Sequence, residues 1–206
     1  PDLYFFEPEV VIKLSEKEIY IEEDDPAAIF KTLNETEVDT ETFSSTKSLV
    51  IQSRLSQAAY ISTIEKLKKH ILRGDCYEIN FCHEFYATDA VINPISVYNK
   101  LSEVSPNPFS ALYRLDDQWL ICASPERYLK KEGIKLISQP IKGTSIRINN
   151  SDEEDEISRK DLMNSAKDRS ENVMVVDLVR NDMAKLCEEG SVQVDDLYGI
   201  YSFPQV

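Results

Sequence analysis

Two hairpin patterns, followed directly by two helical patterns, occupy the second half of the sequence and limit the folds open to it. The hairpins are expected at residues 110–123 and 127–139, where polar pairs separate short β-rich runs. The helices are expected at residues 151–164 and 168–186. Because strands and helices come in runs and do not alternate strictly, the sequence predicts an α+β fold of antiparallel β-sheets flanked by helices.

Shorter patterns precede and follow this region. Start and stop residues delimit two of them, since Asp25-Pro26 is typical of a helix start and Gly74 of a helix end. We expect a hairpin at residues 10–21, helices at 26–33, 56–74 and 94–104, a polar loop or linker at 34–47, a strand at 49–52 and two short strands after residue 186.

Residues 77–87 alternate, with Ile79, Phe81, His83 and Phe85 on one face. Strict alternation of this kind predicts a strand inside a sheet. A histidine on an apolar face with few metal-type neighbours is more often structural than a ligand, so we interpret His83 as structural.

The charge balance excludes several classes of partner. The chain has 23 Lys and Arg against 37 Asp and Glu, a formal net charge of −14. Such a chain repels phosphate backbones and anionic lipids, so we expect no nucleic-acid and no membrane partner. No apolar run in it is long enough to span a bilayer, and residues 1–10 have neither the basic flank nor the apolar core typical of a signal peptide, so we expect a cytoplasmic protein. Reduced thiols and no zinc site are expected, because the four cysteines show no C-x-x-C spacing: Cys76, Cys82, Cys122 and Cys187.

Three segments are harder to explain by packing alone: 123–127 (A-S-P-E-R), 140–144 (P-I-K-G-T) and 165–172 (S-A-K-D-R-S-E-N). Together they place an acid, an amine and a metal-type carboxylate at the ends of predicted elements, where catalytic groups often lie. Each segment alone is a weak pattern.

Each of these side chains also has a plain structural interpretation. Glu126 could pair with Arg127, Lys142 could be a solvated loop lysine, and Glu171 could favour the positive end of its helix. Spacing alone favours these interpretations over a catalytic role.

Ordered motifs run across nearly the whole chain: G-D-C-Y-E-I-N at 74–80, S-P-E-R at 124–127, P-I-K-G-T at 140–144, K-D-R-S-E-N at 167–172, D-L-V-R-N-D at 177–182 and G-S-V at 190–192. With these motifs the chain resembles the chorismate-utilising enzymes, and among them component I of the aminodeoxychorismate synthases. Lys142 sharpens the resemblance, because the related anthranilate synthases have alanine there, as P-I-A-G-T.

The resemblance implies the amination of chorismate to 4-amino-4-deoxychorismate in p-aminobenzoate and folate biosynthesis, with ammonia from a glutamine amidotransferase subunit. Lys142 would attack ring C2 as the C4 hydroxyl leaves, and ammonia would then displace it. Glu126 would be the general acid and then the base. Glu171 would bind Mg2+, which holds the ring carboxylate, and Gly143 and Thr144 would contact that carboxylate.

Elementary chemistry agrees with these roles. A lysine amine is protonated at neutral pH, so a lysine nucleophile needs a site that removes its proton, usually by desolvation. A hydroxyl is a poor leaving group unless an acid protonates it. Chorismate is a dianion, so an acidic protein needs a cation in the pocket, and carboxylate ligands suit Mg2+.

The resemblance also sets the expected extent of the domain. Residues 1–206 are expected to be part of a single chorismate-binding catalytic domain, with 1–47 the tail of an N-terminal portion and a linker, and with the family's C-terminal segment and its further metal-binding glutamate absent. Such a piece is expected to be inactive, to self-associate, and to present Lys142 and Glu126 on a solvent-open face. Glu78 stands where many relatives have Gln, and the sequence does not assign its role.

Two alternatives remain open. The first is component I of anthranilate synthase, which Lys142 disfavours. The second is a non-catalytic acidic interaction module that uses residues 152–156 as its contact surface, although a charge run of this kind is more often a solvated helix face.

Overall fold

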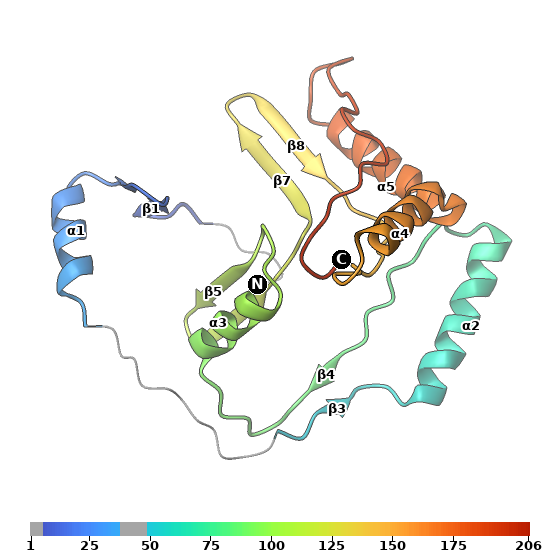
Figure 1. Cartoon of the computed structure of the whole chain (residues 1–206), viewed down its shortest axis with the longest axis horizontal. Coiled ribbons are helices and arrows are strands. Elements are labelled where there is room, and N and C mark those ends of the chain that lie inside the picture. The colour runs from blue at the N-terminus through green and yellow to red at the C-terminus, as the bar shows by residue number, and fades with distance from the viewer. Residues whose placement is uncertain (1–5, 38–48) are drawn as a thin grey trace. The chain divides into compact units, whose positions relative to one another are not determined.

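The computed structural model describes residues 6–37 and 49–206, and the chain divides into two units, Pro1–Thr42 and Phe43–Val206. In the first unit, β1 (Val11–Leu14) and β2 (Ile19–Glu22) pair antiparallel, and α1 (Pro26–Glu35) follows (Figure 1). The Asp25 side chain accepts a hydrogen bond from the Ala28 amide at 3.1 Å. The predicted helix start is therefore confirmed.

In its described residues, the second unit contains three small antiparallel sheets, each of two strands, and four helices (Figure 1). The hairpins β5–β6 and β7–β8 follow one another, and the helices α4 and α5 come after them, in the predicted order. The elements are β3 (Gln52–Ser53), α2 (Gln57–Arg73), β4 (Phe85–Tyr86), α3 (Pro94–Val104), β5 (Ala111–Leu115), β6 (Gln118–Cys122), β7 (Arg127–Glu132), β8 (Lys135–Gln139), α4 (Asp152–Asn164) and α5 (Ala166–Ala184).

Local chemistry explains the ends of these elements. The Ser56 side chain accepts a hydrogen bond from the Ala59 amide and begins α2, and Gly74 ends it in the left-handed conformation, with φ of 85°. The turn residue Asp116 has φ of 53° and Gly133 has φ of 58°, as tight hairpins require. Helix α3 contacts both strands of the β5–β6 hairpin, and α4 contacts α5.

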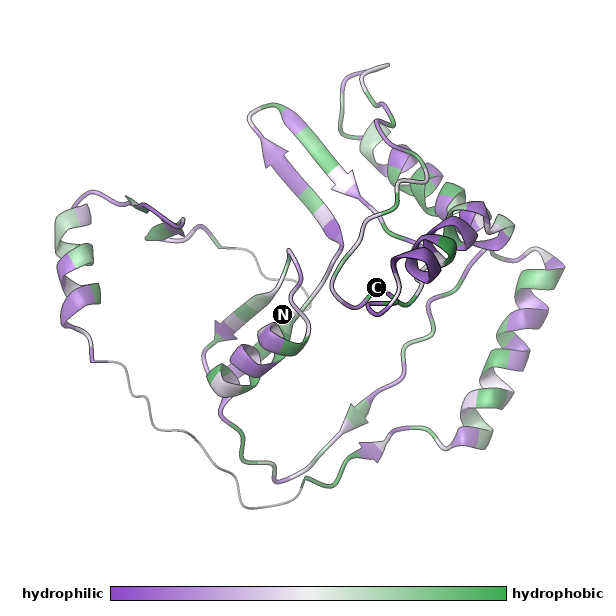
Figure 2. Ribbon diagram, in the orientation of Figure 1, coloured by the Kyte–Doolittle hydropathy of each residue, from purple (hydrophilic) through white to green (hydrophobic). Residues whose placement is uncertain are grey.

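None of the described residues is fully buried. Large apolar side chains are mostly exposed at Leu72, Tyr128, Ile134 and Leu186, and Figure 2 shows apolar residues along several helices and strands, whereas α4 is mainly hydrophilic. Apolar exposure on this scale is typical of a surface that another chain segment or another molecule covers. The expected self-association stays a prediction.

Three expected strands differ from the structure. The predicted strand at residues 77–87 is wrong for most of its length, since only Phe85–Tyr86 (β4) is a strand there, and its partner β3 offers two residues for pairing. The two strands expected after residue 186 are also wrong, because residues 187–206 contain no strand. Alternation specifies two faces, but a strand also needs a neighbour to pair with its backbone groups.

The structural interpretation of His83 agrees with its contacts. His83 stacks near Tyr60 and Phe85, with ring centroids 5.5 and 4.5 Å away, and its Nε2 lies 2.7 Å from Ser53 Oγ. These contacts suit a structural histidine. All four cysteines are free. Among the described residues, no helix is both long and apolar enough to cross a membrane.

Candidate active site

The β7–β8 hairpin brings two of the predicted motifs to one end of a sheet. Arg127, the first residue of β7, pairs with Gln139, the last residue of β8, and the Arg127 Nε donates to Gln139 Oε1 at 2.7 Å. The residues just before β7 and just after β8 therefore emerge side by side. The Ile141 amide donates to Glu126 Oε1 at 3.3 Å. Glu126 and Lys142, distant in sequence, thus lie at the same end of the hairpin.

Lys142 forms an ion pair that the sequence did not predict. Its Nζ lies 2.6 Å from Oε1 of Glu78, which belongs to the segment after α2. The Lys142 side chain is 23% exposed, whereas Glu126 is an exposed residue. The expectation of a solvent-open face is therefore correct for Glu126 and wrong for Lys142, because Glu78 covers the amine.

Gly143 is held against the start of α5. It has φ of +80°, and a Cβ placed on it would lie 2.9 Å from the Asp168 Cβ. The Ser165 side chain accepts from the Asp168 amide and donates to its carboxylate, which fixes Asp168 in the first turn of α5. The loop can approach α5 this closely because residue 143 has no side chain. Sequence reasoning missed Asp168, although the S-x-x-D spacing at 165–168 is a cap pattern that indicates it.

Thr144 is exposed and lines two cavities. The larger, of about 580 Å³, lies along α4 and the start of α5. The smaller, of about 100 Å³, lies between the loop at 141–147, α4 and residues 199–206, and Lys142 and Gly143 also line it. Gly143 and Thr144, which are predicted to contact a substrate carboxylate, therefore both lie on a loop that lines a cavity.

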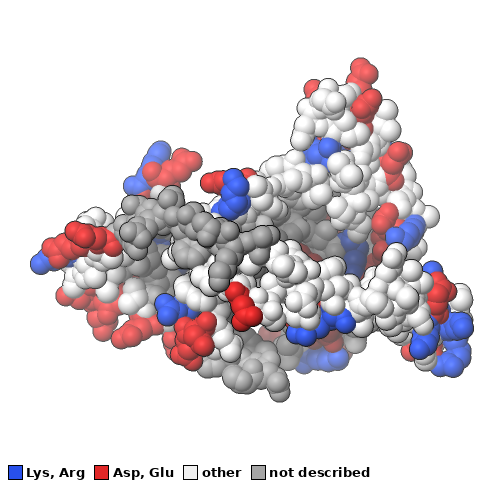
Figure 3. Space-filling view, turned by 90° about the horizontal axis from the view of Figure 1, so that it is seen from below, with Lys and Arg blue, Asp and Glu red and all other residues white. Residues whose placement is uncertain are grey.

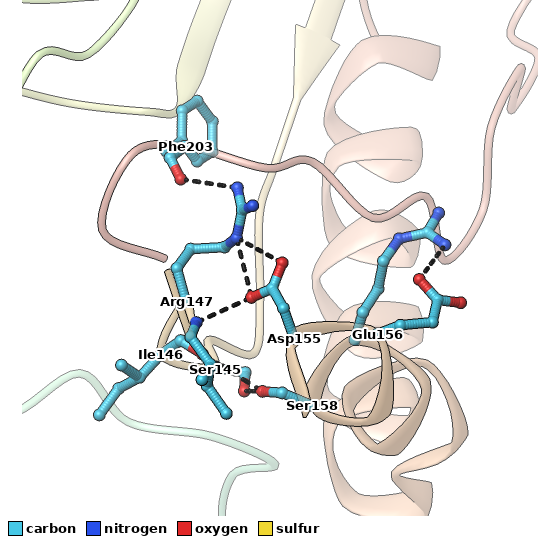
Figure 4. Close-up of polar contacts among 9 residues, drawn as sticks. Ser145, Ile146, Arg147, Asp155, Glu156, Ser158 and Phe203 are labelled. Carbon is cyan, nitrogen blue, oxygen red and sulfur yellow. Dashed lines mark hydrogen bonds and ion pairs between the residues drawn. The ribbon is translucent and has the colours of Figure 1, made fainter. Parts of the chain in front are cut away.

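Arg147 anchors the loop that follows Thr144 (Figure 4). Its Nε donates to both oxygens of Asp155 on α4, at 3.0 and 2.9 Å, and its Nη1 donates to the Phe203 carbonyl at 3.2 Å. The Ile148 amide donates to Asp155 Oδ1 at 2.8 Å. The hydrogen bonds from the Arg147 guanidinium and the Ile148 amide lower the pKa of Asp155 below its ordinary value. Sequence reasoning missed this pair.

Glu171 lies one turn into α5, with its side chain 35% exposed, and pairs with Lys167 at 3.6 Å. In the part of the chain that the structure describes, no hydrogen bond or ion pair joins Glu171 to Lys142 or Glu126. The same part contains no group of three or more His, Cys, Asp or Glu side chains that could hold a metal ion. Glu171 is thus a single potential ligand and not a complete metal site.

Comparison with known proteins gives a consistent family. Residues 2–206 match the family model described as chorismate binding enzyme. Aminodeoxychorismate synthase component 1 of Escherichia coli (strain K12) is 35% identical over 155 residues, which cover 75% of this chain and 34% of that protein. The probable anthranilate synthase component 1 of Schizosaccharomyces pombe is 37% identical over 155 residues, 75% of this chain and 31% of that protein. This chain spans about a third of the length of these curated relatives.

A solved structure supports the fold. Anthranilate synthase component I from Streptococcus pneumoniae TIGR4 has a TM-score of 0.69 and 25% identity, over 87% of this chain and 42% of that one. The predicted α+β class, with small antiparallel sheets and helices, is confirmed.

Proposed function

The chain belongs to the chorismate-binding enzyme family, and from this premise we propose that it contains the aminating site of an aminodeoxychorismate synthase component I. The reaction would convert chorismate and ammonia to 4-amino-4-deoxychorismate. The position of Lys142 is the observation that supports the proposal most. Its side chain is 23% exposed, it lies at one end of the β7–β8 hairpin, and its neighbour Ile141 donates a hydrogen bond to Glu126. The relatives at 34–35% identity include aminodeoxychorismate synthase component 1 of several bacteria.

In the proposed reaction, the Lys142 Nζ lone pair forms a bond to ring C2. Both conjugated double bonds of the ring shift, the C4–O bond breaks, and the hydroxyl leaves as water with the proton of Glu126. Ammonia then attacks C4, both double bonds shift back, and the bond between C2 and Lys142 Nζ breaks with its electron pair returning to Nζ. The Glu126 carboxylate takes the proton that the new amine releases, so the acid is regenerated.

The exposure of Glu126 suits this double role. Its carboxylate accepts a hydrogen bond from the amide of Ile141, the residue before Lys142, at 3.3 Å. Because Glu126 is exposed in the described chain, substrate has room to approach it. Gly143 and Thr144 would contact the substrate's ring carboxylate from the adjoining loop, which lines the cavities.

Glu171 is the proposed magnesium ligand of this chain. Mg2+ keeps several waters and commonly takes one or two protein carboxylates together with substrate oxygens, which a single half-exposed glutamate fits. When bound, the ion would neutralise part of the charge of the dianionic substrate. A glutamine amidotransferase subunit is the proposed ammonia source, in keeping with the designation component 1 of the relatives.

Anthranilate synthase component I is the second candidate within the family. The Schizosaccharomyces pombe and Streptococcus pneumoniae proteins support it by overall similarity. Lys142 argues against this second candidate. The anthranilate synthases that this sequence resembles have alanine at that position, so their reaction needs no lysine nucleophile.

The acidic interaction module has less support. Asp155 pairs with Arg147, and Glu156 pairs with both Arg159 and Lys160. Part of the acidic run is therefore neutralised within the chain. Acidic and basic side chains are both spread over the face shown in Figure 3.

Product analysis tests the proposal. The full-length protein is incubated with chorismate, Mg2+ and an ammonium salt, and the products are identified by mass spectrometry. We expect 4-amino-4-deoxychorismate. Anthranilate as the main product would establish the second candidate, and no consumption of chorismate would contradict both.

A further inference from the structure

Glu78 and Lys142 are 64 positions apart in the sequence and are in direct contact, with Glu78 Oε1 2.6 Å from Lys142 Nζ. Their side chains are 29% and 23% exposed. The contact joins the segment after α2 to the loop after β8. The proposed reaction steps of Lys142 and Glu126 give Glu78 no role.

This ion pair differs from most of the others. Among the described residues, only Lys142–Glu78 and Arg147–Asp155 have both side chains no more than a third exposed. The remaining pairs lie at the surface, where solvent screens them and their contribution is small. An arginine keeps its proton under all ordinary conditions, whereas a lysine can give its proton up. Of these two less exposed pairs, Lys142–Glu78 is therefore the one in which a proton can pass from the cation to the carboxylate.

Two further carboxylates lie near the loop that contains Lys142. The Glu126 carboxylate accepts a hydrogen bond from the Ile141 amide, and Asp168 lies against Gly143, the residue after Lys142. Carboxylates from three different segments therefore lie near residues 141–143, and Glu78 is the one that contacts the Lys142 amine. The 2.6 Å contact with Glu78 holds the Lys142 amine in place in the free site.

Substrate entry changes the surroundings of the pair. A bound substrate displaces water from both side chains, and loss of water disfavours the charged forms of lysine and glutamate alike. The substrate also adds negative charge beside the Glu78 carboxylate, which favours a protonated glutamate. Both effects favour transfer of a proton from nitrogen to oxygen across the 2.6 Å contact.

We propose that Glu78 is a positioning residue that holds Lys142 in the free site and accepts its proton when substrate binds. This inference rests on the proposed role of Lys142 as nucleophile. One N–H bond of Lys142 breaks, an O–H bond forms on Glu78 Oε1, and the lone pair stays on Nζ for the attack on the ring. When Lys142 leaves the ring carbon, Glu78 returns the proton.

The first test needs no substrate. The full-length protein is labelled with a trace of acetic anhydride between pH 6 and 10, and acetylation of Lys142 is measured by peptide mass spectrometry. In Glu78→Gln, Lys142 loses the carboxylate that contacts and covers its amine, so we expect at least threefold more labelling at pH 7.5. Glu84→Gln is the matched control, because Glu84 lies on the same segment but pairs with Arg54 at the surface. Equal labelling of Lys142 in the wild type and Glu78→Gln would overturn the pairing.

The second test measures formation of the Lys142 adduct in a single turnover as a function of pH. With Glu78 present, we expect the rate to vary little between pH 6.5 and 8.5. In Glu78→Gln, water must take the proton, so the rate should fall at least tenfold at pH 7 and rise steeply with pH, with KM little changed. Glu78→Asp keeps a carboxylate and should restore part of the rate and the flat profile.

The outcomes separate the two proposals. An adduct that forms in Glu78→Gln with the rate and pH profile of the wild type would overturn the assignment of Glu78 alone. Absence of any Lys142 adduct in the wild type would overturn the proposed function and the proton transfer with it. Circular dichroism spectra of each variant show whether the fold is retained.

Discussion

The amide of Ile141 donates a hydrogen bond to the carboxylate of Glu126 at 3.3 Å, which places the proposed acid one residue from the proposed nucleophile. The pairing of Arg127 with Gln139 makes this contact possible, since it aligns the start of β7 with the end of β8. The chemistry of the site therefore depends on the register of a hairpin.

Glu126→Gln should separate chemistry from binding. Glutamine keeps the shape and an oxygen that can accept from Ile141, but it cannot supply a proton to the leaving hydroxyl. We predict a KM near that of the wild type and a kcat lower by about 10²-fold or more, the usual size of a general acid contribution. Steady-state kinetics with chorismate and ammonium ions measure both. A raised KM with an unchanged kcat would show that Glu126 binds substrate and does not act as an acid.

Glu171→Gln should fail in a different way. The substitution removes the negative charge of the proposed magnesium ligand, so the apparent affinity for Mg2+ should fall while excess Mg2+ restores much of the rate. Rates measured across a Mg2+ titration, with Glu126→Gln in parallel, check this. If excess Mg2+ rescued Glu126→Gln but not Glu171→Gln, the two roles would have to be exchanged.

Gly143→Ala should disrupt the loop that contains Lys142. A Cβ at this position would lie 2.9 Å from the Asp168 Cβ, and φ is +80°. We expect the loop to shift and turnover to fall by about 10²-fold, since small misplacements of reacting groups can cost that much. Gly133→Ala is the matched control, because Gly133 also has a positive φ but a Cβ placed on it would meet no atom within 4 Å. Similar losses in both variants would mean that backbone strain, and not the approach to Asp168, limits position 143.

We expect Asp155 to stabilise the folded chain at neutral pH and to lose this effect in acid. Hydrogen bonds from Arg147 and Ile148 lower its pKa in the folded chain below the ordinary 3.8, so its contribution is present above that value and is lost as the pH falls through the lower, folded-state pKa. Asp155→Asn should lower the melting temperature of the full-length protein at pH 7, and the difference from the wild type should shrink below pH 3.8.

The control for this prediction is Asp177→Asn, whose partner Arg180 lies at the surface with a side chain 52% exposed. Solvent screens such a pair, so its removal should leave the melting temperature nearly unchanged at every pH. A difference between Asp155→Asn and the wild type that stays constant from pH 7 to pH 2 would contradict the pKa assignment.

Features set by neighbouring residues were predictable from the sequence. The cap at Ser56 and the left-handed Gly74 bound α2 as expected, because the hydrogen bonds that start and end a helix lie within one turn. The two hairpins and the order of α4 and α5 follow from turn chemistry and periodicity in the same way.

Features that depend on distant segments were not predictable. The strand expected at residues 77–87 is mostly absent, since alternation does not reveal whether a partner strand is available. In the same segment, the contact of Glu78 with Lys142 spans 64 positions, and no local pattern specifies it. Sequence motifs named Lys142, Glu126, Gly143 and Thr144, but the neighbours of these residues emerged only from the fold.

The most direct test of the proposed chemistry is to locate the covalent bond between enzyme and substrate. The full-length protein is mixed with chorismate and Mg2+ without ammonia, quenched, digested and analysed by peptide mass spectrometry, with Lys142→Ala in parallel. We predict a substrate-derived adduct on Lys142 in the wild type, no adduct in Lys142→Ala, and in that variant either loss of amination or a shift of product toward anthranilate. An adduct that maps to another lysine, or that persists in Lys142→Ala, would contradict the assignment of Lys142 as the nucleophile.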